Sequence, residues 1–448
     1  MADSTPVRWG DIEYAEVEGH HIAWRAVVGD SGGEHEIVMI PAAFIPIESL
    51  DGDPVARRLV EGLALLGRVV LFDRRGIGLS DPMLDWETPL LLQNVADLDA
   101  VIEAAALSRP TVFDWRSGRL AVMHAATHPE RVGRLVLFNP WGPLFHTDAE
   151  WLQRWLERRD AVVEGGVREL MIMLTRSDDA DLRAWLDAAG RAGASPSLAR
   201  RLYATESNDP VPEWANAVAP SLVLTRYDGA AGHIVPREYS ERVVELLPNV
   251  ERVVLTDGDL WPIGGGVDEV LAEISRFLTG EVRLPPPERR LAAILFTDLV
   301  DSTVAAATAG DTKWKQVLDR HDRITRLAVA RCNGEVVKWT GDGSLAVLPS
   351  ATAAIDAAVA VRDQLLDAGL AVRIGVHVGE IDSRGGDVSG LAVNTAARIM
   401  SKAAAGQILV SAIVPPLIGD SGRNFDEQDT CQLKGVPGTW TLWSLANP

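Results

Sequence analysis

The sequence predicts two domains, and the first has an α/β fold built on a mostly parallel, doubly wound sheet. Over the first 280 residues, short apolar runs of four to six residues alternate with longer amphipathic segments. This pattern is typical of strands separated by crossover helices. Three consecutive prolines at 285–287 then interrupt it. Since 448 residues exceed what one core usually organises, we expect a domain boundary at the prolines.

The elements of the first domain are expected in a regular order. Strands are predicted where aliphatic and β-branched residues cluster, and helices where apolar residues recur every three to four positions. The strands cover 36–41, 68–73, 111–113, 134–138, 221–224 and 252–255, and the helices cover 54–66, 89–106, 120–127 and 267–278. Between about 141 and 218 the strands stop and segments rich in Trp, Arg and Asp take over, which predicts an inserted helical cap.

Two motifs carry a resemblance of this domain to a known family. They are DRRGIGLSDP at residues 73–82 and AATHPERV at residues 125–132. With these motifs, residues from about 8 to 280 resemble the α/β-hydrolase fold, and we expect this domain to cover residues 1–280. Both stretches are structural in that family, so the resemblance implies the fold without implying hydrolysis.

The hydrolase machinery implied by the resemblance is incomplete at the nucleophile. Active members carry a serine in a tight Gly-x-Ser-x-Gly turn between a strand and a helix. Counting back from residues 125–132 places Trp115 at the nucleophile position and Phe113 where a glycine belongs. Ser117 is the other candidate, but bulky Trp115 and Arg119 would crowd its turn.

The base and the acid are also in doubt. The sequence has no histidine between His233 and His321, so the loop near 258–262, where the family places its base, lacks one. The acid position is occupied by Gly232 and His233, although Asp228 lies close by. A serine without a base is not activated, and we expect no ester hydrolysis. The Trp-rich cap is most simply a packing element, and a pocket for a small apolar ligand is the alternative.

Residues 281–288 are expected to form a linker. The triple proline forbids a helix and favours a stiff, extended spacer. Residues 289–448 then form the second domain.

Two aspartates at the ends of predicted strands are the first chemical signal in the second domain. The apolar run 291–296 leads into Asp298, and a predicted hairpin carries Asp342 in a Gly-Asp-Gly turn between Val337 and the strand 344–348. Such turns tolerate unusual backbone angles and expose the acid. Two strand-end aspartates are what a pair of hard divalent cations requires.

Further along, an alternating strand is predicted over 372–380, and an Ala-rich, helix-favouring stretch follows. This stretch contains Asn394 and Arg398, which are four residues apart and therefore project from one helical face. Residues 289–446 resemble, over its whole length, the catalytic domain of class III nucleotidyl cyclases. Six residues stand in the family's order and spacing: Asp298, Lys338, Asp342, Asp387, Asn394 and Arg398.

The resemblance implies an α+β, ferredoxin-like fold and attack of a ribose 3′-oxygen on the α-phosphorus, with loss of diphosphate. It implies that Asp298 and Asp342 bind two divalent cations, Mg²⁺ or Mn²⁺. It also implies that Arg398 stabilises the pentavalent phosphate and that Asn394 orients the ribose. Weaker candidates for phosphate binding are Ser302, Thr303 and Lys434, the first two because backbone amides after a strand can cradle phosphate.

Hydrogen-bonding capacity predicts the base. Adenine offers an acceptor at N1 and a donor at its amino group, and guanine offers the reverse. Lysine only donates and a carboxylate only accepts. Lys338 with Asp387 therefore matches ATP and leaves unpaired groups against GTP, which gives strong discrimination.

In this family the metal-binding aspartates of one chain meet the other four residues on a second chain, so the resemblance implies a homodimer with two interfacial sites. We expect an adenylyl cyclase that forms 3′,5′-cyclic AMP, a lyase of signal transduction, with an N-terminal pseudo-hydrolase domain that regulates it or senses a ligand. Two alternatives stay open. One is a bifunctional protein that also hydrolyses esters, and the other is a nucleotide-binding regulator with a silent cyclase site.

Composition excludes several other classes. The net charge of −20 argues against nucleic-acid partners and anionic membranes. The two cysteines, Cys332 and Cys431, lack metal-type spacing and suit a reducing cytosol. The N-terminus has no signal-peptide pattern, and no apolar run approaches the roughly 18 residues of a membrane span. We expect a cytoplasmic protein.

Overall fold

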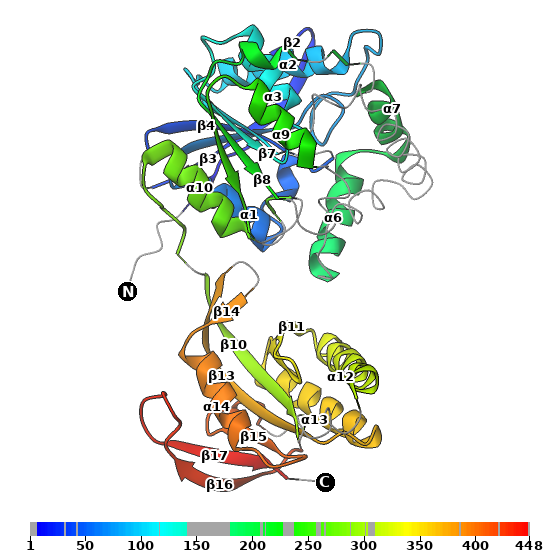
Figure 1. Ribbon diagram of the computed structural model, residues 1–448, viewed down its shortest axis with the longest axis vertical. Helices are drawn as coiled ribbons and strands as arrows, with labels where there is room; N and C mark the ends of the chain where they lie inside the picture. Colours follow the sequence, from blue (N-terminus) through cyan, green and yellow to red (C-terminus); the bar gives the residue numbers. More distant parts are fainter. Residues whose placement is uncertain are drawn as a thin grey trace. The chain divides into compact units, whose positions relative to one another are not determined.

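The computed structural model divides the chain into two compact units, Met1–Pro286 and Pro287–Pro448 (Figure 1). The residues that it describes are 7–30, 33–41, 44–115, 117–140, 180–206, 209–210, 212–226, 237–256, 261–263, 266–286, 288–300, 302, 310–384, 387–419 and 422–446. None of the helices in these ranges is long and apolar enough to cross a membrane.

The first unit contains a nine-stranded sheet in the order β1-β3-β5-β4-β6-β7-β8-β9, with β2 paired to β3. The strands are β1 (Val7–Trp9), β2 (Glu13–Val17), β3 (His20–Gly29), β4 (His35–Ile40), β5 (Gly67–Phe72), β6 (Thr111–Asp114), β7 (Arg134–Phe138), β8 (Ser221–Thr225) and β9 (Val250–Val254). All pairs from β5 to β9 are parallel, and those of β1, β2 and β3 are antiparallel. The predicted α/β-hydrolase fold is therefore confirmed. The three antiparallel strands β1, β2 and β3 were not among the predicted strands.

Helices cover both faces of this sheet. They are α1 (Pro54–Ala64), α2 (Leu90–Ala104), α3 (Arg119–Thr127), α6 (Ala180–Gly193), α7 (Pro196–Glu206), α9 (Arg237–Leu246) and α10 (Val267–Thr279). One apolar core joins α1 and α10 to the sheet, and a second joins α2, α3 and α9 to its other face. Within the predicted cap, α6 and α7 are helical as expected, and residues 141–179 lie outside the described residues.

The motif at residues 73–82 has a structural role in this unit. The Asp73 carboxylate accepts hydrogen bonds from the backbone nitrogens of Ile47 at 2.8 Å and Leu79 at 3.0 Å. Burial raises the pKa of Asp73 to about 6. The Ser80 hydroxyl joins the same loop to β3, because it accepts a bond from the Ala23 nitrogen at 2.9 Å.

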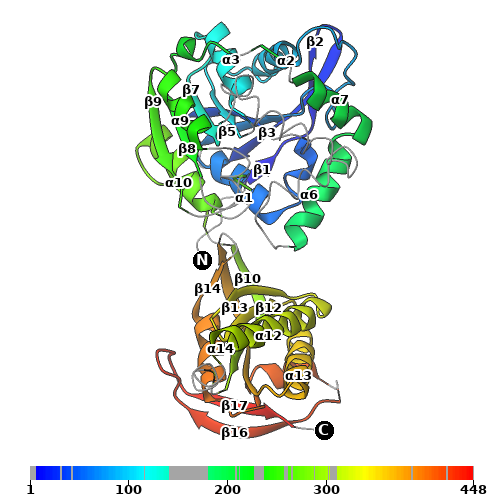
Figure 2. The same ribbon diagram turned by 45° about the vertical axis from the view of Figure 1, so that its right-hand side comes forward.

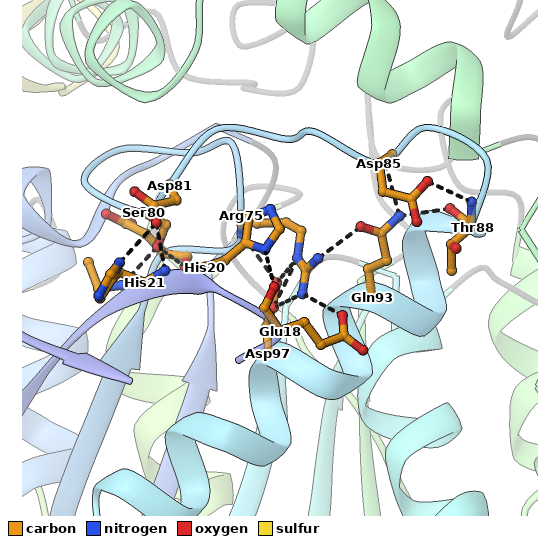
Figure 3. Close-up of polar contacts among 12 residues, drawn as sticks. Glu18, His20, His21, Arg75, Ser80, Asp81, Asp85, Thr88, Gln93 and Asp97 are labelled. Atoms are coloured by element: carbon orange, nitrogen blue, oxygen red, sulfur yellow. Dashed lines mark hydrogen bonds and ion pairs between the residues drawn. The ribbon is translucent and has the colours of Figure 1, made fainter. Parts of the chain in front are cut away.

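A buried ion pair anchors the same motif to α2 (Figure 3). Arg75 Nε lies 3.0 Å from Asp97 Oδ1, and Arg75 Nη1 donates to Gln93 Oε1 at 2.9 Å. Both charged side chains are buried, and Glu18 lies 3.9 Å from the guanidinium. Removing one partner of such a pair leaves an uncompensated buried charge, so this cluster holds the loop in place.

The last residues before the unit boundary are bound to the first unit. Arg58 of α1 donates from Nε to Asp268 Oδ1 at 2.7 Å and from its other two nitrogens to the carbonyls of Pro285 and Pro286, both at 3.0 Å. The Arg58 and Asp268 side chains are mostly buried. The predicted linker thus begins with a segment held against α1 and α10, and the first strand of the second unit begins at Glu288.

The second unit contains an eight-stranded, mostly antiparallel sheet in the order β11-β12-β10-β13-β15-β17-β16, with β14 paired to β13. The strands are β10 (Glu288–Leu299), β11 (Glu335–Trp339), β12 (Gly343–Leu348), β13 (Val372–Arg384), β14 (Asp387–Ser389), β15 (Ile408–Ser411), β16 (Phe425–Cys431) and β17 (Trp440–Leu445). The helices are α12 (Asp311–Arg331), α13 (Ala351–Asp367), α14 (Leu391–Lys402) and α15 (Val414–Ile418).

The two faces of this sheet carry separate cores. Ala293 and Leu295 of β10 pack with α12 and α13, whereas the alternate residues Ile294 and Phe296 pack with α14. Figures 1 and 2 show α12 and α13 on one side of the sheet and α14 on the other. The predicted α+β fold is confirmed. Because successive side chains of a strand point to opposite faces, β10 contributes apolar residues to both cores.

Candidate functional site

The predicted metal ligands Asp298 and Asp342 lie at neighbouring strand ends of the second unit. Asp298 is opposite Gly343 in the register of β10 and β12, and Gly343 directly follows Asp342. The Leu299 nitrogen donates to the Asp342 carbonyl at 3.0 Å. Backbone hydrogen bonds therefore fix the two acidic residues side by side. Because β10 continues to Leu299, Asp298 belongs to the strand itself and not to the turn after it.

Arg373 is a partner of this pair that sequence reasoning missed. It stands opposite Asp298 in the antiparallel register of β10 and β13, and its Nε donates to Asp298 Oδ2 at 2.7 Å. The carboxylate is 16% exposed and the guanidinium side chain 38% exposed. The arginine thus balances the aspartate charge and keeps part of its cationic surface open to solvent.

The structure places the weaker candidates for phosphate binding in different surroundings. The Ser302 hydroxyl donates to Asp342 Oδ2, so it joins the acidic pair, whereas Thr303 lies outside the described residues. Lys434 is exposed in the turn between β16 and β17. Its neighbours Leu433 and Val436 pack in one cluster with Ile399 of α14.

The helix predicted around Asn394 and Arg398 is α14. Both residues are exposed, and between them Thr395 and Ala396 are buried. The two polar side chains therefore lie on the outer surface of the helix, while its other side packs on the sheet. Asp387 is placed by its backbone at the start of β14, opposite Arg384, and its side chain is outside the described part of the structure.

Lys338 lies on β11, which forms one edge of the sheet. It is exposed and stands opposite Leu345 of β12. Leu345 belongs to the core beneath α14, so Lys338 is directed to that side of the sheet, and β11 also approaches β14. The residues predicted to read the base are thus on strands that meet at the α14 side.

The donor set of the acidic pair fits a hard divalent cation. Carboxylate oxygens of Asp298 and Asp342 and the hydroxyl of Ser302 are the ligand types that Mg²⁺ and Mn²⁺ prefer. Within the described residues, no group of three or more His, Cys, Asp and Glu could hold a metal. Mg²⁺ usually binds through one or two carboxylates together with substrate phosphates and waters, and the residues present match that requirement.

The position predicted for a nucleophile in the first unit is occupied by a tryptophan. β6 ends at Asp114, Trp115 follows, and α3 begins after Gly118, whose φ of +77° suits glycine. The Trp115 ring packs edge-on against Trp261, with centroids 5.7 Å apart and planes at 89°. Both rings are buried, and no acceptor among the described residues reaches Trp115 Nε1.

The other positions predicted for the triad are described only in part. Trp261 belongs to the loop where a base was expected, and Arg226, directly after β8, donates to the carbonyl of Gly266 at 3.0 Å and contacts that of Trp261 at 3.4 Å. Ser117 is buried, and its hydroxyl accepts from the Arg119 nitrogen at 3.3 Å. Asp228, Gly232 and His233 lie outside the described residues.

Comparison with known proteins finds a family match for the second unit. Residues 286–447 match the family model described as adenylate and guanylate cyclase catalytic domain. "Putative adenylate cyclase 3" of Rhizobium meliloti is 30% identical over 172 residues, which is 35% of this chain and 28% of that protein. The solved adenylate/guanylate cyclase/hydrolase of Silicibacter pomeroyi is 29% identical, with a TM-score of 0.33, over 36% of this chain and 99% of that one.

A second curated relative is of another kind. Proline iminopeptidase of Neisseria gonorrhoeae is 30% identical over 138 residues, or 30% of this chain and 40% of that enzyme. The chain spans less than half the length of the two curated relatives described here. The family match is confined to the second unit: residues 286–447, less than half of the chain, match the adenylate and guanylate cyclase catalytic domain model.

Proposed function

We propose that this chain converts ATP to 3′,5′-cyclic AMP and diphosphate, at two equivalent sites of a homodimer. The observation that carries the proposal is the backbone pairing that holds Asp298 beside Asp342 at one end of β10. Two strand-end carboxylates with a hydroxyl donor are the protein part of a two-cation phosphoryl-transfer site.

In this proposal each residue has a separate task. The cations held by Asp298 and Asp342 would activate the ribose 3′-hydroxyl and neutralise the diphosphate that leaves. Arg373 keeps positive charge next to Asp298, where its exposed part can face a phosphate oxygen. Ser302 holds the Asp342 carboxylate in place.

Base selection is assigned to Lys338 and Asp387. Lysine donates to adenine N1, and the carboxylate accepts from the adenine amino group. With guanine the lysine would face a donor and the carboxylate would face an acceptor. Arg398 and Asn394 would serve the phosphate and ribose from α14. Because they lie on its exposed outer surface, we propose that they act on a nucleotide held by the aspartates of a second chain.

The test is product formation by the purified full chain with ATP and Mg²⁺ or Mn²⁺. Asp298→Ala and Asp342→Ala should each reduce cyclic AMP to background while the far-UV circular dichroism stays unchanged, since each removes a ligand and little packing. Asp363→Asn, on the exposed side of α13, is the matched control and should keep its activity. Near wild-type activity in both alanine variants would contradict the two-cation assignment, and an inactive wild type would favour a nucleotide-binding regulator.

For the first unit we propose a regulatory or ligand-sensing role without hydrolysis. Its support is the tryptophan pair at the positions of nucleophile and base, since neither side chain can supply the nucleophile or take its proton. We expect no hydrolysis of p-nitrophenyl acetate or butyrate above background. Hydrolysis by the wild type that disappears in Ser117→Ala would establish the bifunctional alternative.

A further inference from the structure

The edge strand that carries Lys338 contains an extra residue. In the antiparallel register of β11 and β12, Val336 stands opposite Ala346 and Lys338 opposite Leu345, with a shift between them. Two residues of β11, Val337 and Lys338, therefore oppose a single residue of β12, which is a β-bulge. Bulges redirect the side chains that follow them.

The bulge decides which face Lys338 uses. Ala346 belongs to the core beneath α12 and α13, and Leu345 to the core beneath α14. Residues that stand opposite each other point to the same face of a sheet, so Val336 faces α12 whereas Lys338 faces α14. In a regular strand of period two, Lys338 would share the face of Val336. The base-reading lysine would then point away from α14.

Trp339 is the next residue, and it returns to the α12 side. Its ring lies 5.9 Å from that of His321 with planes at 76°, and the Arg326 guanidinium lies 5.6 Å from its centroid. His321 is fully buried in α12. An edge-to-face aromatic contact and a cation–π contact both favour this placement of the indole.

β11 needs such an anchor because it is an edge strand. The sheet order ends at β11. Among the described strands, β12 therefore supplies its ladder of hydrogen bonds, and the bulge interrupts part of that ladder. The turn that follows is tight, with the Thr340 nitrogen bonded to the Gly343 carbonyl at 2.9 Å and Gly341 at a φ of +94°. Side-chain packing is therefore the second constraint on this strand: Val336 and Trp339 pack on the α12 side, and Val337 packs against the core beneath α14.

We propose that Trp339 is a positioning residue for nucleotide selection: its contacts with His321 and Arg326 keep the bulge at Val337 in register, so that Lys338 faces the α14 side. This inference rests on the proposed function, in which Lys338 reads the adenine base. It assigns no contact with the nucleotide to Trp339 itself.

The experiment compares kcat/KM for ATP and GTP in the full chain. Trp339→Ala should lower the ATP-to-GTP ratio by about tenfold or more, the size expected when one charge-assisted hydrogen bond is lost. The change should come mainly from a higher KM for ATP. Trp339→Phe keeps an aromatic ring toward α12, and its ATP-to-GTP ratio of kcat/KM should stay close to that of the wild type. The matched control is Trp314→Ala, which removes packing of α12 on the core that α12 shares with α13 and should leave the ratio unchanged.

Each outcome has a defined meaning. An unchanged ratio in folded Trp339→Ala, or the same loss in Trp314→Ala, overturns the positioning role and leaves the cyclase assignment standing. If Trp339→Ala does not fold, His321→Ala removes one contact from the α12 side and must lower the ratio for the proposal to hold. A wild type that shows no preference for ATP would contradict the role of Lys338, and with it both proposals.

Discussion

Two inactive variants should restore activity to each other when their chains share a dimer. Asp298 is held inside the sheet by Arg373, whereas Arg398 lies on the exposed outer surface of α14. If each site takes Asp298 from one chain and Arg398 from the other, an Asp298→Ala dimer and an Arg398→Ala dimer each have two broken sites. A mixed dimer collects both lesions in one site and leaves the other intact, as isologous symmetry requires.

The expected magnitude follows from this symmetry. Random association of equal amounts gives roughly half mixed dimers, each with one working site of two, so the mixture should reach about a quarter of wild-type activity per dimer. The assay is cyclic AMP formation after co-refolding or co-expression with two different affinity tags, which also isolates the mixed dimer. Isolated mixed dimers should show about half of wild-type activity.

The control mixture combines Asp298→Ala with Asp342→Ala. These residues belong to the same half of the proposed site, so every site in their mixed dimer keeps a lesion and no activity should return. Verified mixed dimers of Asp298→Ala and Arg398→Ala without a gain over the separate variants would refute the interfacial site. Each site would then lie within one chain.

Three further predictions concern stability, the linker and base choice. Burial lowers the pKa of His377 to about 4 from 6.5. Between these pH values the unfolded chain binds protons more readily, so the free energy of unfolding should fall as the pH drops through them, by roughly 3 kcal/mol at most. His377→Gln should make the free energy of unfolding, measured by urea titration, depend less on pH, and an equal pH dependence in the two proteins would contradict this. Arg58→Ala should speed tryptic cleavage after Arg283, because the segment loses its bonds to α1, and an unchanged cleavage rate would show that other contacts hold it. Lys338→Glu combined with Asp387→Cys should shift preference from ATP toward GTP with a large loss of rate, as the donor and acceptor pattern reverses; retained ATP preference would mean that other groups read the base.

The fold was predictable where burial leaves a strong pattern. The strands from β4 to β8 are buried on both faces and read as continuous apolar runs. By contrast, β2 is mostly exposed, with only Ala15 buried. Its charged residues interrupt the apolar pattern that would predict a strand. For this reason β2 was not predicted.

The candidate site was predictable only where its residues belong to features formed by neighbouring residues in the sequence. Asp298 and Asp342 follow from strand ends and a turn, which are local features. Arg373 lies 75 residues from Asp298 and meets it only through the register of β10 and β13, which the sequence does not display. The bulge at Val337 is equally invisible, because one extra residue in an edge strand leaves no compositional mark.

The most direct test of the central claim is product analysis of the wild-type full chain given equal concentrations of ATP and GTP with Mg²⁺ or Mn²⁺. Chromatography should show 3′,5′-cyclic AMP as the main product, with one diphosphate released for each cyclic nucleotide and little cyclic GMP. Cyclic GMP as the main product would contradict the assignment of Lys338 and Asp387, and release of orthophosphate without any cyclic nucleotide would contradict cyclisation itself.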